Sequence, residues 1–247
     1  MHMTGNTILI TGGGSGIGRA LAEAFHVRGN TVVIAGRRAE ALAEVTAANP
    51  GMHARTLDIG DAQAIQDFAA ALVRDFPQLG VVVHNAGIMR AEDLRSGETA
   101  DAEAIIRTNL LGPLRLNAAL IGHLLAQPQA TVMTVSSGLA FVPRTDTPTY
   151  SATKAAIHSY SESLRHQLRN TGVQVIELVP PYVQTGLMGE QQANDPNALP
   201  LADFVREVME LLATQPDARE ILVERVKPLR FAEAQGRSRE MLEQRNL

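Results

Sequence analysis

The sequence contains no cysteine and no tryptophan, and only six phenylalanines and three tyrosines among its 247 residues. The absence of cysteine excludes disulfides, thiolate catalysis and cysteine-based metal sites. No hydrophobic run approaches the roughly 20 residues that a helix needs to cross a bilayer. Residues 1–6 lack the basic and hydrophobic regions of a signal peptide, so we expect a cytoplasmic protein.

The chain also has no large excess of positive or negative charge. The formal net charge is -4 at pH 7, and hydrophobic residues make up 45% of the chain. Such a mild negative charge argues against nucleic acid or an anionic membrane as a partner. A chain of this length and hydrophobicity fits one packed domain, and we expect residues 1–247 to form it.

Short runs rich in β-branched residues alternate with longer amphipathic segments. The expected strands are 7–11, 31–35, 81–84, 130–136 and 174–179, with weaker candidates at 53–57 and 220–223. The expected helices are 17–28, 39–48, 61–76, 102–126, 149–170 and 202–214. Several strands are apolar throughout, as strands covered on both faces are. The alternation predicts an α/β fold with a doubly wound parallel sheet of about seven strands and helices on both faces.

Capping and loop residues mark some of the boundaries. Asp61 is the expected N-cap of its helix, and Gly172 stands where the helix before it would stop. Residues 186–200 break the alternation and are rich in Gly, Gln, Asn, Asp and Pro. They form either a plain surface loop or a mobile loop over a substrate site.

A glycine-rich segment, residues 11–18, joins the first expected strand to the first helix. Glycines permit a tight turn and a close approach to a pyrophosphate, which the N-terminus of a helix then stabilises. A nucleoside-triphosphate P-loop is excluded, because Arg19-Ala20 stands where that motif requires Lys and then Ser or Thr. The residues expected to contact a dinucleotide cofactor are Gly12, Ser15, Gly16, Ile17 and Gly18.

The end of the second expected strand indicates which dinucleotide is bound. Folds that prefer NAD usually place an acid there, bonded to the ribose 2′-hydroxyl. Here Gly36 is followed by Arg37 and Arg38, and arginine pairs well with phosphate. The sequence therefore favours NADP(H) over NAD(H). The alternative is that both arginines are solvated and the pocket accepts either cofactor.

Tyr150 and Lys154 are four residues apart, which places them on one face of a helix. A nearby ammonium stabilises a phenolate, so we expect the tyrosine pKa to fall below its reference value near 10. Ser136 and Ser137 end the fifth expected strand, at the edge where α/β sheets bind ligands. A serine there can hydrogen-bond a substrate oxygen. Together with the glycine segment, this pattern indicates an acid/base active site.

These motifs resemble the short-chain dehydrogenase/reductase family, a Rossmann-type fold, over nearly the whole chain. The family's Thr-Gly-x-x-x-Gly-x-Gly pattern fits at residues 11–18. Its Asn-Asn-Ala-Gly motif stands as His84-Asn85-Ala86-Gly87, with His84 in place of the first Asn. Asn109 matches the family's helix asparagine, and Ser137, thirteen residues before Tyr150, matches its catalytic serine.

The resemblance implies a catalytic role for four residues. Tyr150 would be the general acid/base. Lys154 would lower the pKa of Tyr150 and hold the nicotinamide ribose. Ser137 would orient and polarise the substrate oxygen, and Asn109 would hold a water in a proton relay.

The resemblance also implies cofactor contacts beyond the glycine segment. Asp58 would bond the adenine, and Asn85, Ala86 and Gly87 would pack against the adenosine side. Val183 and Thr185 would hold the nicotinamide carboxamide. No metal is expected, and His158, Glu162 and His166, which share a helical face, are interpreted as solvated or at a subunit contact.

Two departures from the family pattern stand beside the site. Pro180-Pro181-Tyr182 replaces the family's Pro-Gly, so we expect a stiffer turn and an aromatic wall from Tyr182. His84 is interpreted as a structural histidine with satisfied hydrogen bonds.

The predicted reaction is hydride transfer between NADP(H) and a small carbonyl or alcohol substrate. The Gly-x-x-Gly-x-x-Gly spacing of epimerase relatives is broken at Ser15, which argues against epimerisation. The alternative function is a non-catalytic NADP(H)-binding regulator or sensor on the same fold. The resemblance implies a homodimer or homotetramer built on the helices of residues 102–126 and 149–170.

Overall fold

The computed structural model describes residues 1–245 and contains one parallel sheet of seven strands. The strand order is β3-β2-β1-β4-β5-β6-β7, so the order reverses between β1 and β4. This is the doubly wound arrangement that the sequence predicts. The strands are β1 (Thr7–Thr11), β2 (Thr31–Gly36), β3 (His53–Thr56), β4 (Leu79–His84), β5 (Ala130–Val135), β6 (Val173–Val179) and β7 (Glu220–Leu222).

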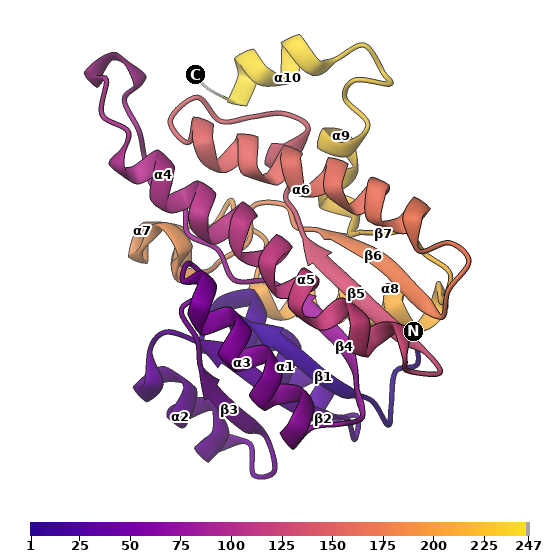
Figure 1. The fold of residues 1–247 in the computed structure, drawn as a ribbon. Helices are drawn as coiled ribbons and strands as arrows, with labels where there is room; N and C mark the ends of the chain where they lie inside the picture. Colours follow the sequence, from indigo (N-terminus) through magenta and orange to yellow (C-terminus); the bar gives the residue numbers. More distant parts are fainter. Residues whose placement is uncertain (246–247) are drawn as a thin grey trace.

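Helices cover both faces of the sheet (Figure 1). One face carries α1 (Gly16–His26), α2 (Ala39–Ala48) and α8 (Leu201–Thr214). The other face carries α3 (Ala62–Asp75), α5 (Gly112–Leu125) and α6 (Pro148–Gln167). The shorter helices are α4 (Ala100–Ile106), α7 (Glu190–Ala193), α9 (Lys227–Arg230) and α10 (Ser238–Arg245). The 3₁₀ turns are η1 (Leu94–Ser96), η3 (Gly138–Ala140), η4 (Gly186–Met188) and η5 (Glu224–Val226).

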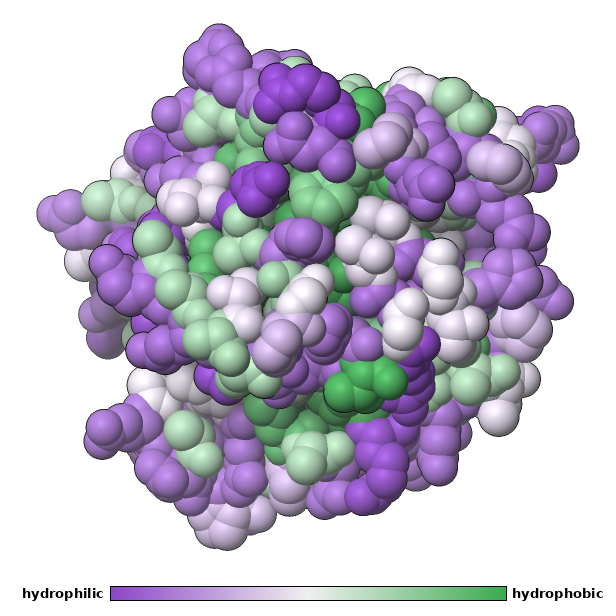
Figure 2. Space-filling model, turned by 90° about the horizontal axis from the view of Figure 1, so that it is seen from below, coloured by the Kyte–Doolittle hydropathy of each residue, from purple (hydrophilic) through white to green (hydrophobic). Residues whose placement is uncertain are grey.

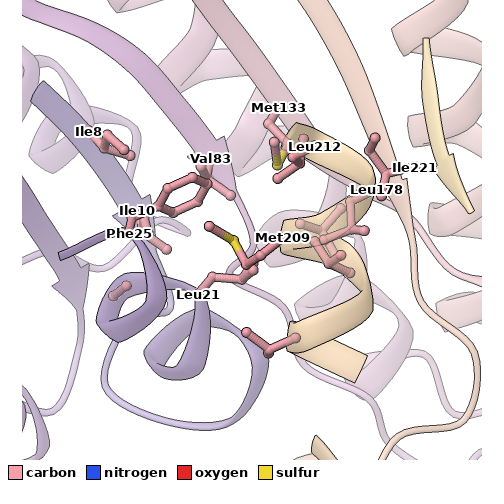
Figure 3. Close-up of a cluster of buried hydrophobic side chains, with 14 of the residues drawn as sticks. Ile8, Ile10, Leu21, Phe25, Val83, Met133, Leu178, Met209, Leu212 and Ile221 are labelled. Atoms are coloured by element: carbon pink, nitrogen blue, oxygen red, sulfur yellow. The ribbon is translucent and has the colours of Figure 1, made fainter. Parts of the chain in front are cut away.

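Successive side chains of the central strands enter two separate cores. Ile10 of β1 packs in the core with α1 and α8, whereas Leu9 packs in the core with α3 and α5. Figure 3 shows the first core, where Phe25 of α1 and Met209 of α8 approach the side chains of the strands. Each fully buried side chain of this kind contributes roughly 1.5–3 kcal/mol. Burial on both faces explains why these strands are apolar throughout.

The segment 102–126, predicted as one helix, is divided by a π-helical turn. α4 leads into η2 (Arg107–Leu111), and α5 begins at Gly112. A Cβ at Gly112 would lie 2.6 Å from the carbonyl oxygen of Ile59, so α5 packs directly against that backbone. Asn109 lies inside the π-helical turn. Such turns occur frequently at functional sites.

Most other boundaries agree with the sequence within a few residues. Asp61 caps α3 as predicted, because its side chain accepts hydrogen bonds from two backbone N–H groups of the first turn. The stop expected at Gly172 is wrong. α6 ends at Gln167, and Gly172 directly precedes β6. Residues 186–200 contain η4 and α7, which the sequence did not indicate.

The surface mixes hydrophobic and hydrophilic residues, as Figure 2 shows for the face seen from below. Among residues 1–245, no helix combines the length and apolar character needed to cross a membrane. Several large hydrophobic side chains are exposed, including Ile106, Leu111 and Leu125 on the α4–α5 segment.

Candidate functional site

A cavity of about 740 Å³ lies at the carboxyl ends of the strands. It is lined by residues at or just after the ends of five strands, namely Gly12, Gly36, Asn85, Ser136 and Pro180. Ligand sites of open α/β sheets lie at this edge, beside the point where the strand order reverses. The volume is typical of sites that hold a cofactor and a small substrate, which are about 300–1,000 Å³.

The glycine-rich turn forms one wall of this cavity. Gly12 and Gly16 have φ of +70° and +53°, a left-handed conformation that glycine adopts without steric cost. A Cβ at Gly18 would lie 2.4 Å from both Asn85 Nδ2 and the Gly12 carbonyl oxygen, so Gly18 is a close-packing position and is itself buried. The Ser15 side chain makes no capping hydrogen bond in the described structure. The first N–H groups of α1 can therefore face an anion.

Basic side chains line the same cavity. Arg37 and Arg38 follow the end of β2, and Arg38 Nη2 donates a 3.3 Å hydrogen bond to Ser15 Oγ. Arg90 and Lys154 are the other charged lining residues, and none of the described lining residues is an aspartate or glutamate. The cavity thus has positive walls, which suit an anionic ligand.

The turn after β4 is hydrogen-bonded to the end of β1. Asn85 Nδ2 donates to the Thr11 carbonyl oxygen at 3.0 Å. The backbone N–H groups of Asn85 and Ala86 both donate to Thr11 Oγ1 at 3.1 Å. Residues 85–87 all line the cavity, and their contact with an adenosine stays a prediction. Thr11 therefore holds in place the turn that carries residues 85–87.

Asp58 is not among the described residues that line the cavity. The residue is exposed, and its carboxylate accepts a 2.9 Å hydrogen bond from Gly60 N. Its neighbours Leu57 and Ile59 line the cavity instead. A contact from Asp58 to an adenine stays a prediction.

Ser137, Tyr150 and Lys154 converge on the cavity from the end of β5 and from α6. Tyr150 and Lys154 are both buried, and Lys154 Nζ lies 5.5 Å from the centroid of the Tyr150 ring. Nζ donates a 2.8 Å hydrogen bond to the carbonyl oxygen of Val135. Ser137 Oγ accepts a 3.1 Å hydrogen bond from Leu139 N, which orients the serine hydroxyl. The structure thus brings the predicted serine, tyrosine and lysine together.

Burial dominates the electrostatics of these residues. It raises the pKa of Tyr150 to about 12, and the hydrogen bond with Ser137 opposes the rise. Burial lowers the pKa of Lys154 to about 8, and the negative charge of Glu177 opposes the fall. The expectation of a lowered tyrosine pKa is therefore wrong for this structure, because burial removes the hydration that stabilises a phenolate. At pH 7 the tyrosine is a neutral phenol and the lysine is mostly an ammonium.

Asn109 is buried behind the cavity, in the π-helical turn. Its Oδ1 accepts from Ile88 N, and its Nδ2 donates to the Ile88 carbonyl oxygen, both at 2.8 Å. Nδ2 also lies 3.4 Å from Thr153 Oγ1. The amide therefore holds Ile88, which lines the cavity. A water held by Asn109 stays a prediction.

Val183 and Thr185 line the cavity after β6, and Gln192 of α7 holds both. Gln192 Nε2 donates to the Val183 carbonyl oxygen at 2.9 Å and to Thr185 Oγ1 at 3.2 Å. Its Oε1 accepts from Met188 N at 3.1 Å. The sequence did not single out Gln192, because one glutamine in a polar segment carries no periodic signal.

The turn after β6 differs in part from the expectation. Pro180 and Pro181 line the cavity, but Tyr182 is not among the described lining residues. The Tyr182 hydroxyl instead donates a 3.1 Å hydrogen bond to Asp195 Oδ2. The side chain therefore connects this turn to the segment 186–200, and the predicted aromatic wall is wrong.

His84 is buried at the end of β4, as expected, but its hydrogen bonds are not satisfied. Neither ring nitrogen has a hydrogen-bond partner among the described residues. Burial lowers the pKa of His84 to about 4, so the ring is neutral at pH 7. The interpretation as a satisfied histidine is therefore wrong.

Glu177 of β6 is a second buried polar residue, and sequence reasoning missed it. Its carboxylate accepts a 2.5 Å hydrogen bond from Ser136 Oγ and lies 2.8 Å from His158 Nδ1. His158, interpreted as solvated or at a subunit contact, is thus paired with an internal acid. A single carboxylate within the apolar run 173–179 was the available signal.

Comparison with known proteins identifies the family. A family model described as short chain dehydrogenase matches residues 6–196. The chain belongs to the short-chain dehydrogenase family. The uncharacterized oxidoreductase DltE of Bacillus subtilis is 40% identical over 240 residues, which is 94% of this chain and 93% of that protein.

Solved structures of short-chain dehydrogenases are similar in fold. One from Streptomyces avermitilis is 25% identical, with a TM-score of 0.84 and 96% of both chains covered. A serine dehydrogenase complexed with NADP⁺ is also 25% identical, with a TM-score of 0.79 over 87% of this chain and 92% of that chain. The fold and family expected from the sequence are confirmed, and the chain is an NAD(P)-dependent dehydrogenase/reductase.

Proposed function

We propose that this chain is an NADP(H)-dependent carbonyl reductase that oxidises the corresponding alcohol in the reverse direction. The observation that carries the proposal is the position of Tyr150, which lines the cavity beside Ser137 and Lys154, and burial favours its neutral phenol by raising its pKa. A phenol in this form can donate a proton to a carbonyl oxygen. The chain thus retains the acid/base group that a non-catalytic binding protein has no use for.

The residues around the cavity fit a dinucleotide with an extra phosphate. The glycine turn and the N-terminus of α1 would hold the pyrophosphate at Gly12, Ser15, Gly16 and Ile17. Arg37 and Arg38 would pair with the 2′-phosphate that distinguishes NADP(H) from NAD(H). The cavity has no described acidic lining residue that would accept a ribose 2′-hydroxyl in NAD(H). These features support the preference for NADP(H).

When bound, the reduced nicotinamide supplies the hydride that adds to the carbonyl carbon. Tyr150 donates its phenolic proton to the carbonyl oxygen, and the product is an alcohol. The Ser137 hydroxyl hydrogen-bonds the same oxygen and stabilises its growing negative charge. The Lys154 ammonium stabilises the phenolate that remains after proton transfer. Asn109 holds Ile88 in the wall of the cavity.

The substrate side of the cavity favours a carbonyl compound with apolar bulk. Ile88, Met89, Pro181 and Leu187 line it together with Tyr150. Residues 186–200 would cover this side, with Gln192 linking α7 to the turn after β6. Cytoplasmic location and a homodimeric or homotetrameric assembly stay predictions.

A spectrophotometric screen of ketones, aldehydes and alcohols with both cofactors tests the proposal. We expect NADPH oxidation with at least one carbonyl of apolar character, and a higher kcat/KM with NADPH than with NADH. Tight NADPH binding without turnover on any carbonyl would instead support the regulator or sensor. A clear NADH preference contradicts the cofactor assignment.

A further inference from the structure

Glu177 lies within the sheet, directly beside two elements of the active site. Its side chain has an exposed fraction of 0%, and its residue pairs in register with Thr134 of β5 and Glu220 of β7. One carboxylate oxygen accepts from Ser136 Oγ at 2.5 Å, and the other lies 2.8 Å from His158 Nδ1. A fully buried carboxylate is costly unless it is paired and hydrogen-bonded, so its position requires a compensating charge.

Lys154 supplies charge of the opposite sign on the same side of the sheet. It precedes His158 by one helical turn of α6, so the two side chains share a helical face. Lys154 is buried, and its ammonium donates a hydrogen bond to a backbone carbonyl, which carries no net charge. Glu177 is the carboxylate whose charge acts on it. The attraction between the two opposite charges thus offsets part of the free-energy cost of burying each of them.

The network continues from Glu177 toward the surface. His158 is a quarter exposed, and the ring of Phe141 packs edge-on against it at 4.8 Å. Arg230 of α9 lies 4.7 Å from the centroid of Phe141 and binds both carboxylate oxygens of Glu220, at 2.6 and 2.9 Å. The charged groups that face Glu177 therefore come from α6, β7 and α9, and their signs alternate.

A metal ion is the competing explanation for part of this cluster. Ligand atoms of His158, Glu177 and Glu220 lie within 4.8 Å of one another. However, the Arg230 guanidinium occupies both oxygens of Glu220, and Ser136 occupies one oxygen of Glu177. The Arg230 guanidinium and the Ser136 hydroxyl compete with a divalent cation for these oxygens, and the positive charge of Arg230 opposes its binding.

We propose that Glu177 is a positioning residue of the active site, which holds the Lys154 ammonium in its charged form and fixes Ser136, the neighbour of Ser137. His158 holds the second oxygen of Glu177 and links it to solvent. The inference rests on the proposed function, because it takes Lys154 and Ser137 as catalytic residues. It adds a residue from β6 to a set that the sequence motifs place on β5 and α6.

The composition of the chain permits a direct test without any substrate. The sequence contains two lysines, Lys154 and Lys227, and Lys227 is half-exposed in an ion pair with Glu224. Protein labelled with ¹³C at the lysine ε-carbons gives two resonances, which Lys227→Arg assigns. Glu177→Gln retains the shape and the acceptor for Ser136 but removes the charge. We expect it to lower the titration midpoint of Lys154 by about one pH unit.

Two further variants control this measurement. Glu162→Gln removes an exposed carboxylate from α6, the helix that carries Lys154, and is expected to leave the midpoint of Lys154 unchanged. Glu177→Asp keeps the charge and is expected to return the midpoint toward that of the wild type. A midpoint that is the same in Glu177→Gln and in the wild type overturns the proposal.

A reciprocal measurement serves if Glu177→Gln does not fold. Lys154→Met removes the cation on one side of Glu177, so the carboxylate attracts a proton to His158 more strongly. We expect the titration midpoint of His158, assigned with His158→Gln, to rise in Lys154→Met. An unchanged His158 midpoint shows that Glu177 does not couple the two residues, and the proposal fails.

The kinetic readout separates positioning from structural support. With a carbonyl found in the screen, Glu177→Gln should lower kcat about tenfold at pH 8.5 and leave KM nearly unchanged. The basic limb of its pH profile should move down by about one pH unit. A loss that is uniform across pH contradicts the proposal. If the wild type reduces no carbonyl, the proposed function fails, while the lysine titration still decides the role of Glu177.

Discussion

Lys154 Nζ donates a 2.8 Å hydrogen bond to the carbonyl oxygen of Val135, the last residue of β5. The bond ties α6 to the strand end that carries Ser136 and Ser137. The ammonium lies 5.5 Å from the centroid of the Tyr150 ring. Its position is therefore set by the backbone of the sheet, and its effect on Tyr150 depends on its charge state.

The pH dependence of carbonyl reduction follows from the pKa values of these two residues. The reaction needs the Tyr150 phenol, present below its pKa of about 12, and the Lys154 ammonium, present below its pKa of about 8. We expect kcat/KM for reduction to be flat near neutrality and to fall about tenfold per pH unit above about pH 8. Alcohol oxidation begins from the phenolate, so its rate should rise with pH. A reduction rate that increases between about pH 8 and 9 contradicts this assignment.

Arg38 is expected to determine the cofactor preference. Hydrogen bonds to a charged group contribute about 1.5–3 kcal/mol, so Arg38→Ala should lower kcat/KM for NADPH by about 10- to 100-fold. The value for NADH should change by less than about threefold. Arg95→Ala is the control, because Arg95 is exposed and pairs with Asp93 away from the cavity. An equal loss with both cofactors would show that Arg38 does not contact the 2′-phosphate.

Gly18 should tolerate no side chain. A Cβ there would lie 2.4 Å from the Gly12 carbonyl oxygen, so Gly18→Ala should lower the free energy of unfolding by about 1–3 kcal/mol and weaken cofactor binding. Gly122→Ala is the matched control in α5, where a Cβ would have no neighbour within 4 Å. That variant should gain about 0.5–1 kcal/mol. Urea unfolding of both variants checks the prediction, and equal stability of the two would refute the packing at Gly18.

His84 makes the stability of the protein sensitive to acid. Burial lowers the pKa of His84 to about 4 in the folded state, against 6.5 for an ordinary histidine, so the unfolded chain binds the proton first as pH falls. Stability contributed by neutral His84 is complete above about pH 7 and is lost toward pH 4. We expect the wild type to lose about 2 kcal/mol more than His84→Asn between pH 7 and 5. Urea unfolding at both pH values measures this, and parallel losses in the two proteins would count against it.

The features that depend on local sequence were predictable. β1 has the predicted bounds, Thr7–Thr11, because its β-branched residues are buried on both faces. The glycine turn and the pair Tyr150 and Lys154 were found because their spacing in the chain fixes their spacing in space. β3 was a weak candidate, because His53–Thr56 is an edge strand with mostly exposed side chains.

The features that depend on packing were not predictable. Glu177 and His158 are 19 residues apart, and their contact exists only because α6 packs against β6. The spacing of Tyr150 and Lys154 predicted an ammonium near the tyrosine, but not how deeply the tyrosine is buried. The predicted direction of the Tyr150 pKa shift was therefore wrong. The contacts of Gln192 require the path of the segment 186–200, which no periodic pattern specifies.

The measurement that tests the central claim most directly is single-turnover carbonyl reduction by Tyr150→Phe with saturating NADPH. The variant removes the phenolic oxygen alone, so we expect the rate to fall about 10²- to 10⁴-fold while the Kd for NADPH changes by less than about twofold. Tyr160→Phe is the control, because Tyr160 lies on α6 with Tyr150 and its hydroxyl accepts a hydrogen bond from Asn117 of α5. This variant should keep the wild-type rate. A Tyr150→Phe variant that reduces the carbonyl at close to the wild-type rate would contradict the account.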